Sequence, residues 1–141
     1  MQIQIKLLNE NCKPYRKYDS DAGFDLRANI EKPLWIPPGG RAKIGTGICI
    51  DIPPGYYGDI RGRSGLNVAG VICPSGTVDA GYTGEIVVVL MNLSRKAYVV
   101  QPRERIAQLV IAPLPKVELV EVDELQGGSR GDKGFGSTGR V

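Results

Sequence analysis

The chain has 141 residues, a length that fits one domain with a buried core rather than two. Its 18 Lys and Arg against 15 Asp and Glu give a modest net charge of +3, and the basic residues are scattered along the chain, which predicts no direct binding of nucleic acid. Because the chain has no histidine, Ser-His-Asp and Cys-His catalysis, histidine bases and imidazole metal sites are excluded, so any enzyme activity must depend on carboxylates and bound ions.

Short apolar runs separated by 19 Gly and 10 Pro predict an all-β domain, since no long stretch keeps apolar residues at helical spacing. An alternating strand at 3–7 is followed by a turn-rich region around Trp35 and then by a long strand at 42–52, which a Pro-Pro-Gly sequence ends. Further strands are predicted at 56–61, 71–73, 85–92, 97–100, 106–112 and 116–122.

One short helix is predicted at 64–69, where Ser64 is suited to cap the first turn. Many short strands at this spacing predict a jelly-roll-like β-sandwich. The run 86–91 is apolar without alternation, so we expect it to be buried on both faces, the second against a neighbouring subunit. We expect a folded domain at 1–125 and a flexible C-terminal arm at 126–141, because the arm is too glycine-rich and polar to fold alone.

The cysteines are odd in number and do not form C-x-x-C pairs, which favours reduced thiols at Cys12, Cys49 and Cys73 over a disulfide framework or a zinc site. No long apolar stretch occurs, so neither a signal peptide nor a transmembrane helix is expected. We therefore expect a cytoplasmic protein that does not associate with membranes.

The segment 76–89, GTVDAGYTGEIVVV, sets one carboxylate and one aromatic ring among small and apolar residues. We interpret it as a hairpin, in which the run before Asp79 pairs with the strand after Tyr82 and both side chains lie at the mouth. Turn chemistry alone would make Asp79 a carboxylate that accepts main-chain amides. Other segments of the chain favour a catalytic role.

Five short motifs occur in fixed order along nearly the whole chain, and together they resemble those of the trimeric deoxyuridine triphosphatases (dUTPases). Each motif would be weak alone. The resemblance implies a dUTPase-like jelly roll that hydrolyses dUTP to dUMP and pyrophosphate with Mg²⁺, as a homotrimer with shared active sites. The motifs are DAGFDLRA (21–28), GRSGLN (62–67), GTVDAGYTGE (76–85), RERIAQLVI (103–111) and RGDKGFGSTGR (130–140).

The same resemblance implies roles for individual residues. Asp79 would deprotonate the water that attacks the α-phosphorus, and Asp25 would hold water on the bound magnesium. Tyr82 would pack on the deoxyribose and exclude a 2′-hydroxyl. The remaining expected contacts are Arg63, Ser64, Gly65 and Gln108 toward the phosphates, Cys73, Thr77, Val78 and Val87 around the uracil, and Arg130, Phe135, Gly136 and Ser137 from an arm that closes over the nucleotide.

Several of these assignments have simpler alternatives. Asp25 is equally an exposed turn carboxylate, Gln108 a glutamine at an edge or interface, and the arm a solvated tail. Cys73 stands where many relatives have an Asn, and a thiol is a poor donor. The base edge would then be satisfied by main-chain groups or by water.

Two other functions are alternatives to dUTP hydrolysis. The related deoxycytidine triphosphate deaminases share the fold, but their catalytic Glu corresponds to Val89 and an Arg that they carry corresponds to Val68, which argues against deamination. A noncatalytic interaction protein built on this fold would be expected to lose the aspartate or the arm motif. Asp79 and Phe135 are both present, which favours the enzyme.

Overall fold

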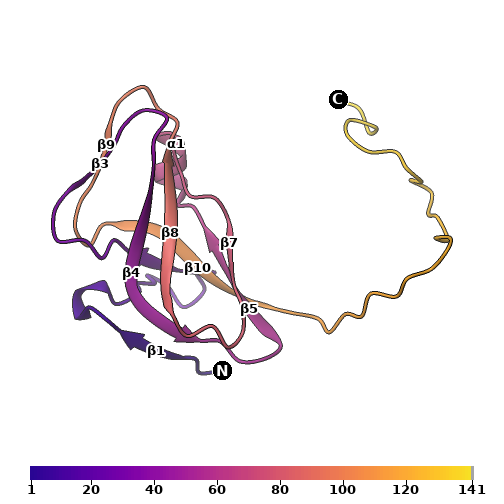
Figure 1. Cartoon of the computed structure of the whole chain (residues 1–141), viewed down its shortest axis with the longest axis horizontal. Coiled ribbons are helices and arrows are strands. Elements are labelled where there is room, and N and C mark those ends of the chain that lie inside the picture. Colours follow the sequence, from indigo (N-terminus) through magenta and orange to yellow (C-terminus); the bar gives the residue numbers. More distant parts are fainter. Residues whose placement is uncertain (141) are drawn as a thin grey trace.

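Two four-stranded antiparallel sheets enclose one apolar core in the computed structural model, which describes residues 1–140 (Figure 1). The first sheet, in spatial order, consists of β1 (Gln4–Leu7), β4 (Arg41–Asp51), β8 (Glu85–Asn92) and β6 (Val71–Ile72). The second consists of β2 (Gly23–Arg27), β10 (Arg105–Pro113), β5 (Tyr56–Arg61) and β7 (Gly76–Val78). The predicted all-β sandwich is confirmed.

Three smaller elements complete the fold. They are a two-stranded sheet of β3 (Leu34–Ile36) and β9 (Tyr98–Val100), the helix α1 (Ser64–Val68) and the 3₁₀ turn η1 (Glu10–Cys12). The predicted short helix is therefore present, but Arg63 is its N-cap and no side chain caps it, so the expected cap at Ser64 is wrong. Neither helix in residues 1–140 has the length or apolarity needed to cross a bilayer.

The strand β8 alternates between the two faces of its sheet. Ile86, Val88 and Leu90 are buried in the core, whereas Val87 is exposed and Val89 is half-buried on the opposite face. Within one chain only one face of this antiparallel sheet packs against the core, so burial of the second face against a neighbouring subunit stays a prediction. An apolar outer face is left uncovered.

A buried asparagine joins the small sheet to the large one. The Asn92 side chain donates hydrogen bonds to the carbonyls of Ile36 (2.9 Å) and Lys96 (2.7 Å), and its oxygen accepts one from the hydroxyl of Ser94 (2.7 Å). A fully buried amide costs free energy unless its donors and acceptors are satisfied. Asn92 therefore fixes the connections at this end of the sandwich.

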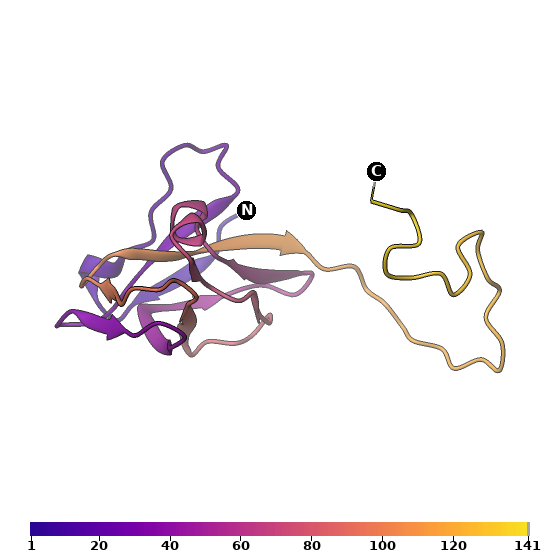
Figure 2. The ribbon, with the colours of Figure 1, turned by 90° about the horizontal axis from the view of Figure 1, so that it is seen from above.

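The chain leaves the sandwich soon after β10, well before residue 126, and the whole extended segment 114–140 forms the C-terminal arm (Figures 1 and 2). Its last main-chain hydrogen bond to the body runs from the Leu114 N–H to the Gly55 carbonyl, at 2.8 Å. The predicted strand at 116–122 does not form, and Leu119 within it is 93% exposed. A strand needs a partner for its main-chain groups, and none lies beside this segment among residues 1–140.

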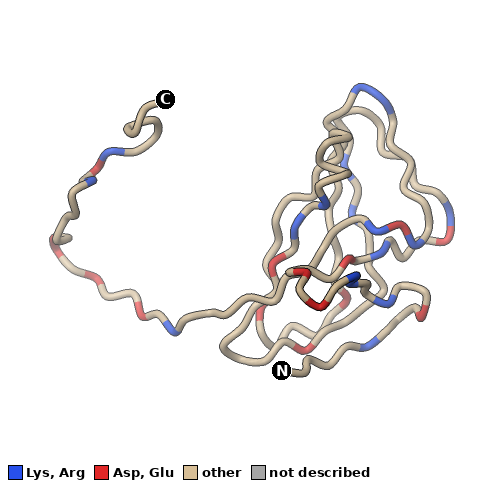
Figure 3. The backbone as a smooth tube through the Cα atoms, turned by 180° about the vertical axis from the view of Figure 1, so that it is seen from behind, with Lys and Arg blue, Asp and Glu red and all other residues tan. Residues whose placement is uncertain are grey.

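Acidic and basic side chains are interleaved over the sandwich, whereas the first part of the arm is mainly acidic (Figure 3). The scattering of basic residues expected from the sequence is therefore also seen in space.

Candidate active site

The strands β7 and β8 are consecutive in the chain but belong to different sheets. β7 pairs with β5, and β8 pairs with β4. The predicted pairing of the two strands with each other is therefore wrong, because each has its ladder partner in its own sheet. The connection 79–84 crosses between the sheets, and a slot opens where the hairpin ladder was expected.

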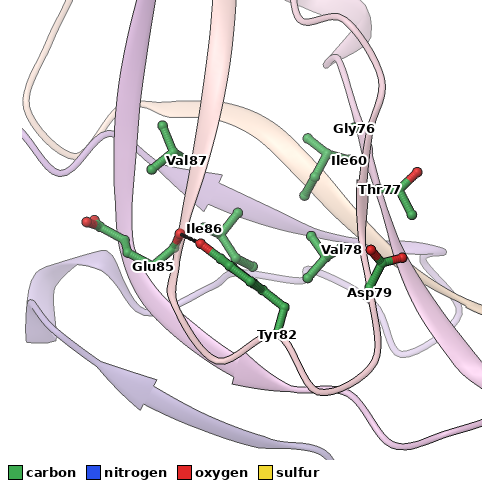
Figure 4. Close-up of a pocket in the computed structure, with 9 residues that line it drawn as sticks. All are labelled: Ile60, Gly76, Thr77, Val78, Asp79, Tyr82, Glu85, Ile86 and Val87. Atoms are coloured by element: carbon green, nitrogen blue, oxygen red, sulfur yellow. Dashed lines mark hydrogen bonds between the residues drawn. The ribbon is translucent and has the colours of Figure 1, made fainter.

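The slot has a volume of about 250 Å³ and lies between β7 and the start of β8 (Figure 4). β7 is the edge strand of its sheet, and β8 from Glu85 to Leu90 pairs with β4 alone. Within the described part of the chain, the strand edges that face the slot therefore have no ladder partner, although the Glu85 carbonyl accepts a hydrogen bond from the Tyr82 hydroxyl. The lining residues are Ile60, Gly76, Thr77, Val78, Asp79, Tyr82, Glu85, Ile86 and Val87.

Asp79 stands at the rim of the slot, directly after β7. Figure 4 shows Ile60 and Val78 pointing toward the slot, while Asp79 and Thr77 project to the outer side of β7. The carbonyl of Asp79 accepts a hydrogen bond from the Tyr82 N–H at 3.1 Å, which closes the turn. The main chain therefore makes the turn, and the exposed Asp79 carboxylate takes no part in it.

The Tyr82 ring is held from two sides. Its hydroxyl donates a hydrogen bond to the carbonyl of Glu85 at 3.0 Å, drawn as the dashed line in Figure 4. A Cβ atom at Gly84 would lie 2.6 Å from that hydroxyl, so only glycine leaves room for the ring. The ring is half-exposed and forms one wall of the slot mouth.

A second group of predicted residues lies on β2, β10 and α1. Asp25 and Gln108 are cross-strand neighbours, and they line a cavity of about 520 Å³ that shares no residue with the slot. Gln108 donates a hydrogen bond to the Gly62 carbonyl at 3.0 Å. Since β10 has partners on both sides, Gln108 is not on an edge strand.

Asp25 and its arginines form the charged centre of this second group. The carboxylate pairs with Arg63 Nε at 3.2 Å and with Arg105 Nη1 at 3.1 Å. Arg63 also donates to the Arg105 carbonyl at 3.0 Å, which fixes its guanidinium beside the exposed Ser64 and Gly65. Asp25 is therefore a half-buried strand residue, and the alternative of an exposed turn carboxylate is wrong.

Cys73 is buried and is not among the residues that line the slot. Burial raises the pKa of its thiol, which lies 3.5 Å from the Pro74 carbonyl. The four arm residues Arg130, Phe135, Gly136 and Ser137 are exposed. The arm that carries them extends away from the sandwich (Figures 1 and 2). Within one chain, the slot, the Asp25 group and the arm are separate.

Three residues of these sites were missed from the sequence. Gly84 and Glu85 end the third motif, and Arg105 lies within the fourth, so each was present in a quoted string without a role. Arg105 is recognised only in space, because the strand pairing of β2 with β10 brings it to Asp25. For Gly84, the packing against Tyr82 is likewise visible only in the fold.

A two-sheet sandwich with main-chain edges beside a carboxylate, and with an arginine at the start of a helix, fits the class of all-β enzymes that bind nucleotides. The chain belongs to the dUTPase family, whose model matches residues 9–139. It is 48% identical over 143 residues to the deoxyuridine 5'-triphosphate nucleotidohydrolase of Chlamydia muridarum, with 99% of each chain covered.

Other known proteins show the same likeness. The nucleotidohydrolase of Anaeromyxobacter sp. is 44% identical over 145 residues, with 98% of this chain and 97% of the relative covered. A variant of the Staphylococcus bacteriophage 80alpha dUTPase with dUpNHpp superposes with a TM-score of 0.85 at 30% identity, covering 99% of both chains. A variant dUTPase from phage phi11 of S. aureus, with a structural Mg(II) ion, gives a TM-score of 0.81 at 26% identity, covering 90% of this chain and 100% of that one.

Proposed function

We infer that this chain is a dUTP diphosphatase, which hydrolyses dUTP to dUMP and pyrophosphate. The reaction limits the incorporation of uracil into DNA and supplies dUMP for thymidylate synthesis. The observation that carries this function is the slot between β7 and β8, because main-chain strand edges and the Tyr82 ring surround one cavity and Asp79 stands at its rim.

Uracil occupies the slot in this proposal, with its pairing edge on the main chain of β7 and β8. Thr77, Val78 and Val87 line the cavity, and the strands that carry them are held rigidly by their own sheets. A site built from fixed donors and acceptors rejects a base with the wrong pattern, since its buried groups would be left unpaired. Cys73 is buried and does not line the slot, so the main chain carries the specificity in this proposal.

Asp79 is the proposed general base. Its carboxylate accepts a proton from a water molecule as the water oxygen forms a bond to the α-phosphorus and the bond from that phosphorus to the α,β-bridging oxygen breaks. Pyrophosphate leaves with that oxygen, and the proton passes from Asp79 to solvent. The exposed rim position of Asp79 supports this role, because a water molecule and a phosphate can both reach it.

The phosphates are proposed to bind at Arg63, Ser64, Gly65 and Gln108. Arg63 is already fixed by Asp25 and by the Arg105 carbonyl, so its orientation is set before the ligand arrives. The exposed hydroxyl and N–H groups at the start of α1 add neutral donors. Together they match the chemistry of a polyanionic chain.

These residues fit a magnesium ion that binds together with the substrate. No group of three or more His, Cys, Asp or Glu side chains gathers in the described residues as a cage for a cation. Mg²⁺ commonly binds through one or two carboxylates plus substrate phosphates and keeps several waters, so Asp25 would contact it through water. When bound, the ion neutralises negative charge on the triphosphate.

A homotrimer with shared active sites is proposed because one chain does not assemble the site. The slot with Asp79 and the group around Asp25 have no lining residue in common, and Asp79 projects away from its own slot wall. The apolar outer face of β8 and the exposed apolar side chains of the arm at 114–125 also need a partner surface. Light scattering that shows an active monomer would contradict this assembly.

The arm supplies the last contacts in this proposal. Phe135 would stack on uracil, while Arg130, Gly136 and Ser137 would contact the phosphates of a site on another subunit. Phe135 is fully exposed in one chain, which leaves its ring available. We propose a cytoplasmic location, since the substrate belongs to the pool of free nucleotides that feeds DNA synthesis.

The activity is tested by pyrophosphate release from each of the deoxynucleoside triphosphates and from UTP, with and without EDTA. We expect turnover of dUTP alone and strong suppression by EDTA. Ammonia release from dCTP is measured in parallel, because it would identify a deaminase. Binding of dUTP without any hydrolysis would instead support the noncatalytic alternative.

A further inference from the structure

A bulge in β4 faces the first residues of β8. Gly45 is paired with Val87 and Cys49 with Glu85, so β4 carries extra residues between these two positions. Gly47 within the bulge has a φ of +70°, a conformation that glycine adopts without strain. The regular ladder is therefore interrupted where β8 begins to form the slot wall.

Side chains replace the missing ladder bonds. The Thr46 hydroxyl donates to the Ile86 carbonyl at 2.7 Å, and the Gly47 N–H donates to Glu85 Oε1 at 2.9 Å. A Cβ atom at Gly45 would lie 2.5 Å from the same carboxylate oxygen, so the bulge encloses it closely. The Glu85 carboxylate therefore belongs to the bulge, although its residue lines the slot.

Two asparagines extend the contact away from the slot. Asn29 Nδ2 lies 3.5 Å from Glu85 Oε1, and Asn29 Oδ1 accepts a hydrogen bond from Asn9 Nδ2 at 2.9 Å. The Asn29 N–H also donates to the Gly45 carbonyl at 2.9 Å. The oxygen of Glu85 is thus held by a network that starts in the loop before η1.

The main chain of the same glutamate holds the Tyr82 hydroxyl. Figure 4 shows the Glu85 side chain turned away from the slot, while its carbonyl accepts the hydrogen bond from Tyr82. The ring packs directly on Gly84, between them in sequence, where a Cβ atom would lie 2.6 Å from the Tyr82 hydroxyl. The position of the ring therefore depends on where the Glu85 peptide is anchored.

We propose that Glu85 is a positioning residue for Tyr82 and so helps to determine the preference for deoxyribose over ribose. The proposal rests on the proposed packing of Tyr82 against the sugar. Without the carboxylate, the Gly47 N–H and the start of β8 lose their link, and the ring is free to move from the place where it blocks a 2′-hydroxyl. Even a small displacement of such a ring changes the reaction rate strongly when the site depends on close fit to the substrate.

The test is the ratio of kcat/KM for dUTP to kcat/KM for UTP. We expect Glu85→Ala to lower this ratio by about tenfold or more, mainly by improving UTP, because the fit around the 2′ carbon is relaxed. Glu85→Gln should restore the wild-type ratio, since its amide oxygen still accepts from Gly47. Should Glu85→Ala fail to fold, Glu85→Asp withdraws the carboxylate by one methylene, and an unchanged ratio in a folded Glu85→Asp would overturn the proposal.

A matched control separates positioning from general loosening. Thr46→Val removes the other side-chain bond of the same bulge, and it should lower Tm while leaving the ratio unchanged. An equal loss of the ratio in Thr46→Val would show that any damage to the bulge has this effect, and the specific role of Glu85 would be wrong.

A double-mutant cycle combines Glu85→Ala with a change at Tyr82. In the Tyr82→Phe background, which lacks the hydroxyl, Glu85→Ala should change the ratio much less than in the wild type, whereas an undiminished effect would overturn the proposal. Tyr82→Ala tests the premise separately. If Tyr82→Ala keeps the full preference for dUTP, the proposed role of the ring at the sugar is wrong. If Tyr82→Ala loses the preference while Glu85→Ala keeps the preference, only the positioning role of Glu85 is wrong.

Discussion

The carboxylate of Asp25 on β2 is ion-paired with Arg63, the N-cap of α1, at 3.2 Å, which joins the first motif to the second. Its other oxygen pairs with Arg105 at 3.1 Å. Because Asp25 is largely shielded from water, these pairs are screened less than surface pairs. Two guanidinium groups on one carboxylate leave positive charge in excess, which favours a polyanionic ligand.

Asp25→Asn keeps the shape of the side chain but removes its charge. With Arg63 and Arg105 less firmly oriented, we expect KM for dUTP at saturating Mg²⁺ to rise about tenfold, and the Mg²⁺ concentration needed for half-maximal rate to rise as well. Steady-state kinetics over a range of Mg²⁺ concentrations measure both. Asp59→Asn is the matched control, since Asp59 pairs with Arg61 outside the two cavities. An unchanged KM at saturating Mg²⁺ would show that the ion pairs do not organise the site.

Asp79→Asn should lower turnover of dUTP by roughly two to four decades, the range for loss of a general base. The fold should survive, because the turn at Asp79 is closed by its carbonyl rather than its carboxylate. Pyrophosphate release gives the rate, and thermal unfolding and dUTP binding are the controls. Near-wild-type turnover in the variant, or a large loss of stability with normal turnover, would return Asp79 to a structural role.

The strands that the sequence predicted well are those with strong local signals. β4, β8 and β10 contain apolar runs, and β5 begins directly after the Pro-Pro-Gly sequence; the structure places all four within a residue or so of the expected limits. β2 and β3 were not predicted. β2 mixes charged and apolar residues in GFDLR, and β3 is a short strand around Trp35 between prolines, so neither shows the usual period.

What the sequence could not supply is the choice of partners. The run at 116–122 has the composition of a strand but remains single, because strand formation depends on a neighbour as well as on side chains. β7 was expected beside β8 since they are adjacent in sequence, yet it pairs with β5. The motifs identified Asp79 and Tyr82, but only the fold shows that Glu85 anchors the ring.

Arg103→Gly should stabilise the protein. Arg103 has a φ of +65°, a left-handed conformation that strains a residue with a Cβ atom, and its side chain is exposed. Relief of about 1–2 kcal/mol of strain exceeds the entropic cost of glycine, so we expect the free energy of unfolding in urea to rise by about 0.5–1 kcal/mol. Arg95→Gly, at another exposed arginine without positive φ, should instead be neutral or destabilising. Equal effects of the two changes would contradict the strain at Arg103.

Tyr98 should make stability fall in alkaline solution. Burial, together with its hydrogen bond to Glu104, raises the pKa of the Tyr98 hydroxyl above its ordinary value. The unfolded chain therefore loses this proton at lower pH than the folded one, so the contribution is complete below about pH 10 and declines as pH rises further. Urea unfolding of wild type and Tyr98→Phe from neutral to alkaline pH should show the stability difference between them shrinking above that pH. A stability difference that stays constant with pH would contradict the raised pKa of Tyr98.

The arm should be mobile without ligand and become ordered over the nucleotide. Phe135 is fully exposed and the glycines around it keep the free arm flexible, so closure costs entropy that stacking and phosphate contacts must offset. Stacking of a base on an aromatic ring is worth roughly 1–3 kcal/mol. Deletion of residues 128–141 should therefore leave a folded protein that binds dUTP weakly and hydrolyses it poorly, and Phe135→Ala should show a milder form of the same defect.

Limited proteolysis tests the closure of the arm directly. Trypsin cleaves after Arg130 and Lys133, which are both exposed and lie in turns of the arm. A nonhydrolysable dUTP analogue should slow cleavage at these two positions in the wild type, because ordering removes the extended conformations that the protease needs. Phe135→Ala should lose most of this protection at the same analogue concentration, while cleavage without ligand stays unchanged. If the two sites are cut equally fast with and without the analogue in the wild-type protein, the arm is only a solvated end and does not close.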